Sequence, residues 1–210
     1  MNDMFGPGSN APARIHTDYE ELRKKVEACK ALGKRVVLTS GTFDILHVGH
    51  ATYFEKAKEA AGNPENTVLV VGVDSDEKVA KRKGEVRRRT VVQQDERMAM
   101  LCHLRHIDLV MLKGAGDPHW QLVRTVRPDI LVISERTRYT KENVEALKEF
   151  CGTVTELPSQ GETSTTARIR LLYILAGQKF KDGFLAFAGQ VRQQLDDFAE
   201  SIEKMMGGSA

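Results

Sequence analysis

The chain has 210 residues, of which 41% are hydrophobic and 29% charged, proportions typical of a globular protein with room for one sizeable α/β domain. Its net charge of +2 at pH 7 is too small to indicate a nucleic-acid partner by itself. No run approaches the roughly 20 apolar residues of a membrane span, and three scattered cysteines favour buried thiols in a reducing compartment, so we expect a cytoplasmic protein without a membrane partner.

The first residues predict a leader followed by a helix. Residues 1–15 are rich in Gly, Pro, Asn and Ala, a composition that favours disorder. Thr17 or Asp18 can cap a helix whose apolar residues recur at helical spacing as far as Leu32. Gly33 can then end this helix.

Strands and helices alternate through the middle of the chain. The run at residues 67–73 is apolar, which suits a parallel strand covered on both faces. Alternating strands and helices imply right-handed crossovers, so we predict an α/β fold with a Rossmann-like, doubly wound parallel sheet of about five strands. The Gly-x-Gly-x-x-Gly fingerprint of dinucleotide-binding proteins is not found. Strands are expected at residues 35–39, 67–73, 107–112, 129–133 and 153–156, and helices near residues 47–61, 94–103, 119–125 and 142–150.

The C-terminal region has a different pattern. From Gly183 onward, apolar residues recur in alternating steps of three and four, which predicts one apolar stripe on a helix of about six turns. The stripe can pack on its own domain or form a subunit contact, and we favour a homodimer. It comprises Ala188, Val191, Leu195, Phe198, Ile202 and Met205. The expected organisation is a leader (1–15), a catalytic domain (16–176), a C-terminal helical extension (177–206) and a flexible tail (207–210).

The segment Ser40–His50, Ser-Gly-Thr-Phe-Asp-Ile-Leu-His-Val-Gly-His, carries the strongest functional signal. It lies between a predicted strand and a predicted helix, where open α/β sheets bind ligands. If the helix begins near His47, then His47 and His50 share one face of its first turn. Gly49 leaves room for an anion at the positive end of that helix. Either histidine alone can be a cap or a surface residue, but together they indicate a site for nucleotide phosphates.

Two further segments allow both a functional and a purely structural interpretation. Ser164, Thr165 and Thr166 precede an apolar-periodic segment, so they can cap a helix or hold phosphates with their hydroxyl and N–H groups. The basic run at residues 78–89, which we expect to form a loop, can be a solvated face, a source of cations for phosphates or a nucleic-acid patch. It contains no aromatic residue, which disfavours a nucleic-acid partner.

The motif residues resemble the signature of a known family. Gly-Thr-Phe-Asp at residues 41–44 before His-x-Gly-His at residues 47–50 is similar to the signature of the cytidylyltransferase-like nucleotidyltransferases. Residues 163–170, Lys83-Gly84 and Asp95-Glu96-Arg97 resemble further elements of that family. The resemblance implies catalytic roles for His47, His50, Lys81, Lys83 and Arg168, with Arg170 as the alternative to Arg168, and nucleotide contacts by Gly41, Thr42, Phe43, Asp44, Gly49, Arg97, Ser164, Thr165 and Thr166.

Within that family, residues 17–175 look most similar to the heptose-1-phosphate adenylyltransferases. The resemblance implies transfer of a nucleotidyl group, AMP in preference to CMP, from ATP or CTP to a phosphorylated small acceptor such as a sugar phosphate, with release of pyrophosphate. Alternatives of the same fold are FAD-synthetase-like and pantetheine-phosphate-type adenylyltransferases and glycerol-3-phosphate cytidylyltransferases. A non-catalytic module that binds a nucleotide or nucleic acid is the alternative of another class. Residues 133–139 depart from the heptose pattern and leave the base and the acceptor open.

The chemistry that this resemblance implies needs cations more than a base. An acceptor phosphate has a second pKa near 6, so its oxygen is already an anion at neutral pH. We expect the two histidines to donate to the phosphate oxygens, the basic residues to neutralise them, and Mg²⁺ to bridge them. Asp44 either orients the site and contacts the nucleophile or the metal, or it caps a turn.

Overall fold

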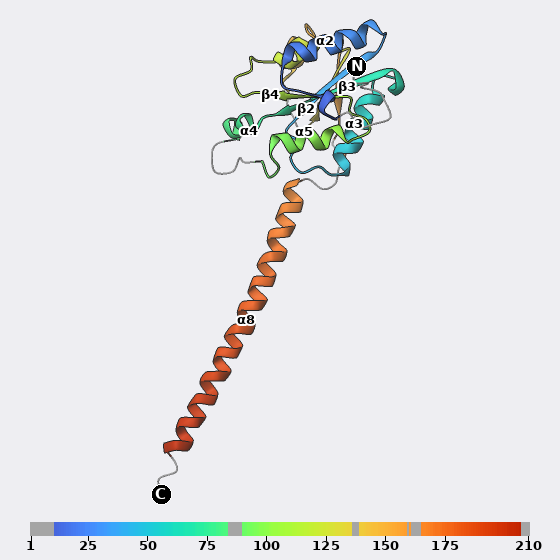
Figure 1. Ribbon diagram of the computed structural model, residues 1–210. Coiled ribbons are helices and arrows are strands. Elements are labelled where there is room, and N and C mark those ends of the chain that lie inside the picture. Colours follow the sequence, from blue (N-terminus) through green and yellow to red (C-terminus); the bar gives the residue numbers. More distant parts are fainter. Residues whose placement is uncertain (1–10, 84–89, 136–138, 159, 161–164, 207–210) are drawn as a thin grey trace. The chain divides into compact units, whose positions relative to one another are not determined.

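The computed structural model describes residues 11–83, 90–135, 139–158, 160 and 165–206 (Figure 1). For Lys83 and for residues 165–171 it describes the backbone but not the side chain. The chain divides into two compact units, Met1–Glu162 and Thr163–Ala210, and each is described by itself.

The first unit contains a parallel sheet of six strands in the order β1-β4-β3-β2-β5-β6. The chain passes from β2 through β3 to β4 and then returns to the other side of β2, so the strand order reverses beside β2, where open α/β sheets bind their ligands. The strands are β1 (Ile15–His16), β2 (Arg35–Gly41), β3 (Thr67–Asp74), β4 (Leu109–Lys113), β5 (Ile130–Ser134) and β6 (Thr153–Leu157).

Helices cover both faces of this sheet, with α2 on one face and α3 and α5 on the other (Figure 1). Each face has its own apolar core. Alternate residues of β3 enter opposite cores, Val70 one and Leu69 and Val71 the other, and all three are fully buried, as its apolar run predicts. The helices are α1 (Ala11–Arg14), α2 (Tyr19–Ala31), α3 (Val48–Glu59), α4 (Asp76–Lys83), α5 (Gln94–Cys102), α6 (Gln121–Val126) and α7 (Lys141–Leu147), with a 3₁₀ turn at Pro64–Asn66.

The predicted strands and the Rossmann-like arrangement are confirmed. Helix α2 also begins and ends as predicted, and the Asp18 carboxylate caps it by accepting hydrogen bonds of 2.8 Å from the backbone N–H groups of Glu20 and Glu21. Gly33, which follows α2, has a φ of +73°, a backbone conformation that favours glycine.

Two expectations from the sequence are wrong. The leader predicted for residues 1–15 does not extend to residue 15, because Ala11–Arg14 form α1 and Ile15 begins β1, which pairs with β4. Arg14 holds this segment in place by donating to the backbone carbonyl of Asp108 at 3.1 Å. The basic run is not a continuous loop, because its first residues belong to α4. Residues 1–10 and 84–89 lie outside the described residues.

In the second unit the described residues form one helix, α8 (Thr165–Met206), of 42 residues. At 1.5 Å per residue its length is about 63 Å. The sequence predicts two helical segments, one after Ser164 and one from Gly183, and the structure joins them, so the predicted domain limit at residue 176 falls within α8. Among the described residues, no helix is long and apolar enough to cross a membrane.

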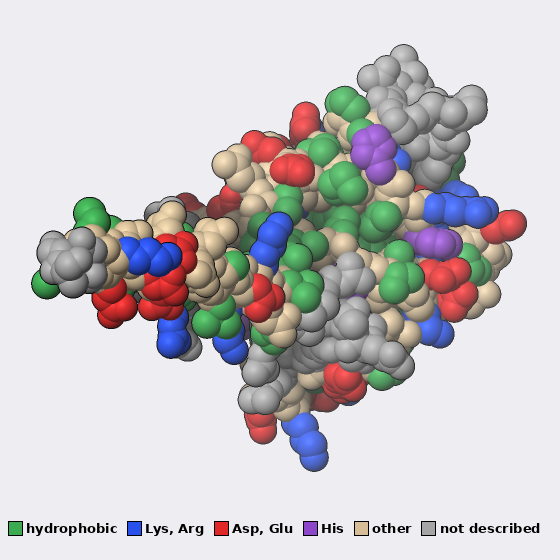
Figure 2. Space-filling view, turned by 90° about the horizontal axis from the view of Figure 1, so that it is seen from below, with side chains coloured by type: hydrophobic (Ala, Val, Ile, Leu, Met, Phe, Trp, Pro, Cys, Tyr) green, Lys and Arg blue, Asp and Glu red, His purple; other side chains and the backbone are tan. Residues whose placement is uncertain are grey.

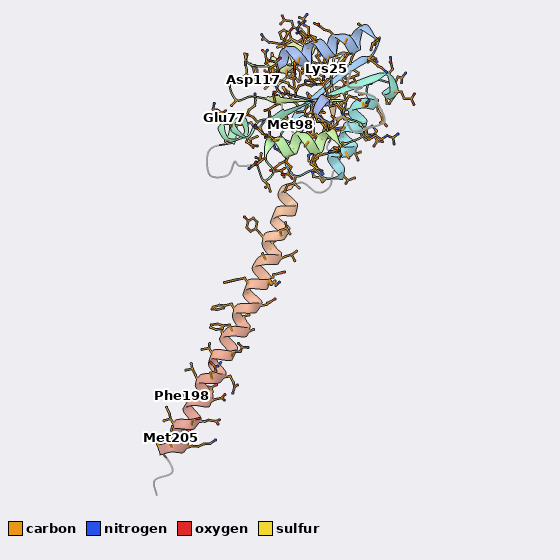
Figure 3. All side chains as sticks on the ribbon, in the orientation of Figure 1. Lys25, Glu77, Met98, Asp117, Phe198 and Met205 are labelled. Carbon is orange, nitrogen blue, oxygen red and sulfur yellow. The ribbon has the colours of Figure 1, made fainter. Side chains whose placement is uncertain are left out.

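Many large apolar side chains of α8 are exposed. Phe198 is 62% exposed and Met205 is 72% exposed, and both project from the helix into solvent (Figure 3). Figure 2 shows apolar side chains on the surface of α8 beside acidic and basic ones.

Candidate active site

The turn between β2 and α3 builds the centre of the site. It begins after Gly41, and His47 is the N-cap residue of α3. Phe43 has a φ of +49°, a strained conformation for a bulky residue, and its ring packs on Phe54 with 5.0 Å between ring centroids. A Cβ atom at Gly41 would lie 3.0 Å from that ring. The glycine therefore lets Phe43 fold back over the end of β2.

His47 and His50 lie side by side, as their spacing predicts. Their ring centroids are 4.0 Å apart, and the planes are tilted by 32°. The backbone N–H of His47 donates to Nδ1 of His50 at 3.4 Å. Because Nδ1 accepts this hydrogen bond, a neutral His50 ring carries its proton on Nε2. The buried Gly49 lies between the two histidines in the first turn of α3, whose N-terminal end favours an anion.

Asp44 fixes the backbone segment that precedes α5. Its carboxylate accepts hydrogen bonds from the N–H groups of Val91, at 2.9 and 3.0 Å, and of Val92, at 2.9 Å. Of the two interpretations of Asp44, the structure therefore shows the one in which it caps backbone groups. A contact with the nucleophile or with a metal stays a prediction.

The carboxylates of the site determine whether the protein itself can hold magnesium. Among the described residues, no group of three or more His, Cys, Asp or Glu side chains is arranged to hold a metal ion. The carboxylates of Asp44 and Asp74 are engaged by backbone N–H groups and by cations. Mg²⁺ commonly binds through one or two carboxylates together with substrate phosphates and water. The described residues do not form a protein cage for this ion.

The buried side chain of Arg97 connects the turn with the neighbouring segments through hydrogen bonds. Its side chain is fully buried, and Nε donates to the carbonyl of Val92 at 3.0 Å. Nη1 donates to the carbonyl of Thr42, and Nη2 donates to the carbonyl of Asp74 at 2.9 Å and to Oδ1 of Asp76 at 2.6 Å. Arg97 thus ties together the segments that follow β2 and β3 and the segment that precedes α5. The nucleotide contact that the family resemblance implies for Arg97 stays a prediction, because each guanidinium nitrogen already donates to a protein acceptor.

The pKa of Asp76 reflects this arrangement. Burial by itself would raise that pKa, but the hydroxyl of Thr90 and the guanidinium of Arg97 donate to the carboxylate and hold its pKa below the ordinary value. The ionised form of Asp76 is therefore part of the folded state at neutral pH.

Sequence reasoning missed a cluster around Asp74. The side chain of Asp74 is 3% exposed, and it pairs with Nη1 of Arg82 at 2.8 Å and with Nζ of Lys113 at 3.1 Å. Arg82 also donates from Nη2 to the hydroxyl of Thr42 at 2.9 Å, so it reaches the histidine turn. Asp74 and Lys113 are the last residues of β3 and β4. Their positions at strand ends were the available signal, since ligands bind at this edge of a parallel sheet.

The remaining predicted residues are not brought into this cluster by the described contacts. Nζ of Lys81 pairs with Glu77 at 2.8 Å, and the Lys81 side chain is 64% exposed. Lys83 ends α4, and its side chain lies outside the described part of the chain. The same holds for Ser164 and for the side chains of Thr165, Thr166, Arg168 and Arg170. Their roles stay predictions.

Comparisons with known proteins agree with this geometry. The chain matches the model of the cytidylyltransferase-like family over residues 38–176. It is 37% identical over 124 residues to the bifunctional protein HldE of Aliarcobacter butzleri, which covers 59% of this chain and 24% of that protein. It is 38% identical over 151 residues to the bifunctional protein HldE of Pseudomonas paraeruginosa, a match that covers 70% of this chain and 30% of that protein. The chain thus spans less than a third of the length of these relatives.

A solved structure shows a likeness of fold alone. The pantoate-beta-alanine ligase of Francisella tularensis, in complex with beta-gamma ATP and beta-alanine, is 13% identical to this chain with a TM-score of 0.51. The likeness covers 70% of this chain and 67% of the ligase.

Proposed function

Because the chain belongs to the cytidylyltransferase-like family, we propose that it transfers a nucleotidyl group from a nucleoside triphosphate to a phosphorylated small acceptor and releases pyrophosphate. The observation that carries the proposal is the pair of imidazoles of His47 and His50, with ring centroids 4.0 Å apart, at the start of α3. The start of a helix favours phosphate, and Nε2 of His50 is the ring nitrogen that can donate to it.

The proposed reaction requires no general base. An oxygen of the acceptor phosphate forms a bond to the α-phosphorus of the triphosphate. The bond from that phosphorus to the oxygen that bridges to the β-phosphate breaks, and pyrophosphate leaves with the electron pair. The attacking oxygen is already an anion at neutral pH. The task of the protein is to bring two polyanions together and to stabilise charge on the phosphate oxygens, which preorganised donors and cations do.

Each part of the site has a place in this proposal. The histidines donate to the α-phosphate oxygens, and Arg82 supplies positive charge beside the turn that carries them. Mg²⁺ bound together with the triphosphate would supply further positive charge for its phosphates. Ser164, Thr165, Thr166 and Arg168 are proposed to contact the phosphates, as the family resemblance implies.

We propose ATP as the donor and a sugar phosphate as the acceptor. The support is the identity of 37–38% to relatives named HldE, together with the resemblance of residues 17–175 to heptose-1-phosphate adenylyltransferases. The experiment that follows therefore also includes CTP and other phosphorylated acceptors.

The direct test is a matrix of the four nucleoside triphosphates against phosphorylated sugars, polyols and cofactor precursors. We expect release of pyrophosphate with ATP and a sugar phosphate, and none when the acceptor phosphate is omitted. If no combination releases pyrophosphate, while single-stranded DNA or RNA binds at micromolar concentration in physiological salt, the protein is instead a non-catalytic binding module.

We also propose that the chain forms a homodimer through α8. The apolar stripe on α8 includes Leu195 and Phe198, each 62% exposed. Burying such a side chain stabilises a protein by about 1.5–3 kcal/mol, so the stripe favours a partner. Alternating steps of three and four residues are the spacing of a seam between two helices. A second copy of α8 carries the same stripe, and a two-fold axis pairs identical surfaces.

Substituting the stripe tests the dimer. In the full chain, Leu195→Asp combined with Phe198→Asp is expected to produce a monomer, because it places charges at the centre of the seam. Sedimentation at tens of micromolar protein is the measurement. Gln190→Asp combined with Gln193→Asp is the matched control off the stripe, and we expect it to remain dimeric. A monomeric wild type, or a dimer that survives the stripe substitutions, contradicts the proposal.

A cytoplasmic location is the last part of the proposal. The thiols of Cys29, Cys102 and Cys151 are free and buried, and burial raises the pKa of each. Buried, protonated thiols suit a reducing compartment.

A further inference from the structure

A cavity of about 320 Å³ opens at the carboxyl ends of β3 and β4. Its volume falls within the range of small-molecule pockets, about 300–1,000 Å³. Asp74 and Lys113, the last residues of these two strands, line it, together with Tyr19 from the start of α2 and Trp120 from the loop before α6. It therefore lies at the edge of the sheet where α/β proteins bind ligands.

Arg82 connects this cavity with the histidine turn. It lines the cavity, where Nη1 lies 2.8 Å from Oδ2 of Asp74. Nη2 of the same guanidinium donates to the hydroxyl of Thr42 at 2.9 Å. A single side chain thus borders both the cavity and the site proposed for the triphosphate, so an anionic group at Arg82 lies between them.

The cavity has more cations than carboxylates. Lys78, Arg82 and Lys113 line it, against the carboxylates of Asp74 and Asp117. Burial lowers the pKa of Lys78, and the nearby charge of Lys113 lowers it further. A bound anion would offset this surplus of positive charge, so the part of the cavity near Arg82 and Lys113 suits a phosphate group.

The lining of the cavity also includes aromatic rings and a second carboxylate. The Trp120 ring stacks on His119 with 4.4 Å between ring centroids, and its backbone has a left-handed φ of +59°, an unusual conformation for a bulky residue. The hydroxyl of Tyr19 donates to Asp117, which lies in the loop after β4 (Figure 3). Aromatic faces suit the C–H groups of a sugar ring, and carboxylates accept hydrogen bonds from its hydroxyls.

Gly72 of β3 makes room for Lys113. A Cβ atom at Gly72 would lie 2.9 Å from Cδ of Lys113 and would overlap Leu122 of α6. The missing side chain lets the lysine stem cross the neighbouring strand, so that Nζ reaches Asp74 at 3.1 Å and the hydroxyl of Ser40 at 3.4 Å. The packing of Lys113 over Gly72 therefore fixes the position of the Lys113 charge.

We infer that this cavity binds the acceptor, with its phosphate at Arg82 and Lys113 and its hydroxyl-bearing carbons between Trp120 and Asp117, and that Lys113 selects a phosphorylated acceptor. This inference rests on the proposed function, which supplies the triphosphate on the other side of Arg82. It adds the place of the acceptor and the residues that distinguish it.

The single tryptophan of the chain reports on the cavity directly, because Trp120 is in its wall. Heptose 1-phosphate added to the full chain without a triphosphate is expected to change the Trp120 emission in a saturable way. Free heptose and inorganic phosphate, each lacking half of the ligand, are expected to require higher concentrations. If heptose 1-phosphate supports pyrophosphate release but leaves the Trp120 emission unchanged at concentrations above its KM, the acceptor binds elsewhere and the inference is wrong.

Substitution of Lys113 tests its role in specificity. Lys113→Met keeps the apolar stem and removes the charge, and we expect the KM for the sugar phosphate to rise about tenfold, the effect of one lost charge-assisted contact. The KM for ATP is expected to stay within about twofold. Lys113→Arg should recover most of the loss, and Lys148→Met, on the exposed end of α7, is the matched control. Equal changes in both KM values, or no change in either, would contradict the inference.

These outcomes separate the inference from the proposed function. A saturable Trp120 response without pyrophosphate release from any triphosphate would retain the cavity as a sugar-phosphate site and overturn the proposed reaction. Normal pyrophosphate release with an unchanged acceptor KM in Lys113→Met would retain the reaction and overturn the role of Lys113.

Discussion

His47→Ala and His50→Ala are each expected to reduce turnover about a hundredfold or more, because removal of one preorganised donor to a reacting oxyanion typically costs about 3 kcal/mol. The effect should appear mainly in kcat, since the proposed contacts strengthen as charge develops on the phosphate oxygens. Pyrophosphate release under saturating substrates is the measurement.

The fold should survive both substitutions. The hydrogen bond from His47 N to Nδ1 of His50 is long, at 3.4 Å, so its loss should change the midpoint of thermal unfolding only slightly. His106→Ala is the matched control, because this histidine lies away from the turn, beside Glu55. Rates close to wild type in both active-site variants would contradict the assignment of this turn as the phosphate site.

Arg97→Met is expected to lower the free energy of unfolding by about 3–5 kcal/mol, because it removes a buried charge and leaves its hydrogen-bond acceptors unsatisfied. The methionine keeps much of the volume, so the loss of donors dominates. Denaturant unfolding at neutral pH measures the effect. Arg23→Met is the matched control, since Arg23 also pairs with carboxylates but is exposed, and we expect little change.

The same variant has a pH signature. In the wild type the folded-state pKa of Asp76 is depressed, so its contribution to stability is present above the ordinary value of 3.8 and is lost as the pH falls through the folded-state pKa. Arg97→Met removes one cause of the depression. Its unfolding free energy should therefore fall less steeply than that of the wild type below about pH 4. An equally steep fall in the variant would show that Arg97 does not hold this pKa down.

The sequence predicts those parts of the fold that have a regular pattern of their own. The apolar run of β3 and the helical spacing of α2 identify their elements because burial on two faces or on one imposes that pattern. The two residues of β1 are too few to show any periodicity. Helix α4 consists mostly of charged residues and buries Val79, so its apolar pattern is too weak to indicate a helix.

In the site, too, a contact between residues close in sequence can be predicted, whereas a contact between distant residues cannot. His47 and His50 are close in sequence and share a helical turn, so their spacing predicts their contact. Asp74 and Lys113 are separated by 39 residues and meet because β3 and β4 pair in register. No local pattern encodes that meeting, although each residue directly follows a predicted strand, 67–73 or 107–112. The same pairing brings Gly72 beside Lys113, which explains a glycine within an otherwise apolar strand.

Nucleotidyl transfer is tested most directly by ³¹P NMR of the purified full chain with ATP, Mg²⁺ and heptose 1-phosphate. The account predicts that the acceptor phosphate resonance is replaced by the two coupled resonances of a pyrophosphate diester, and that one free pyrophosphate appears for each diester formed. The same reaction with His47→Ala should show neither change on the same time scale. Formation of ADP and inorganic phosphate in place of the diester and pyrophosphate would contradict the account, as would unchanged spectra with every triphosphate and phosphorylated acceptor of the matrix.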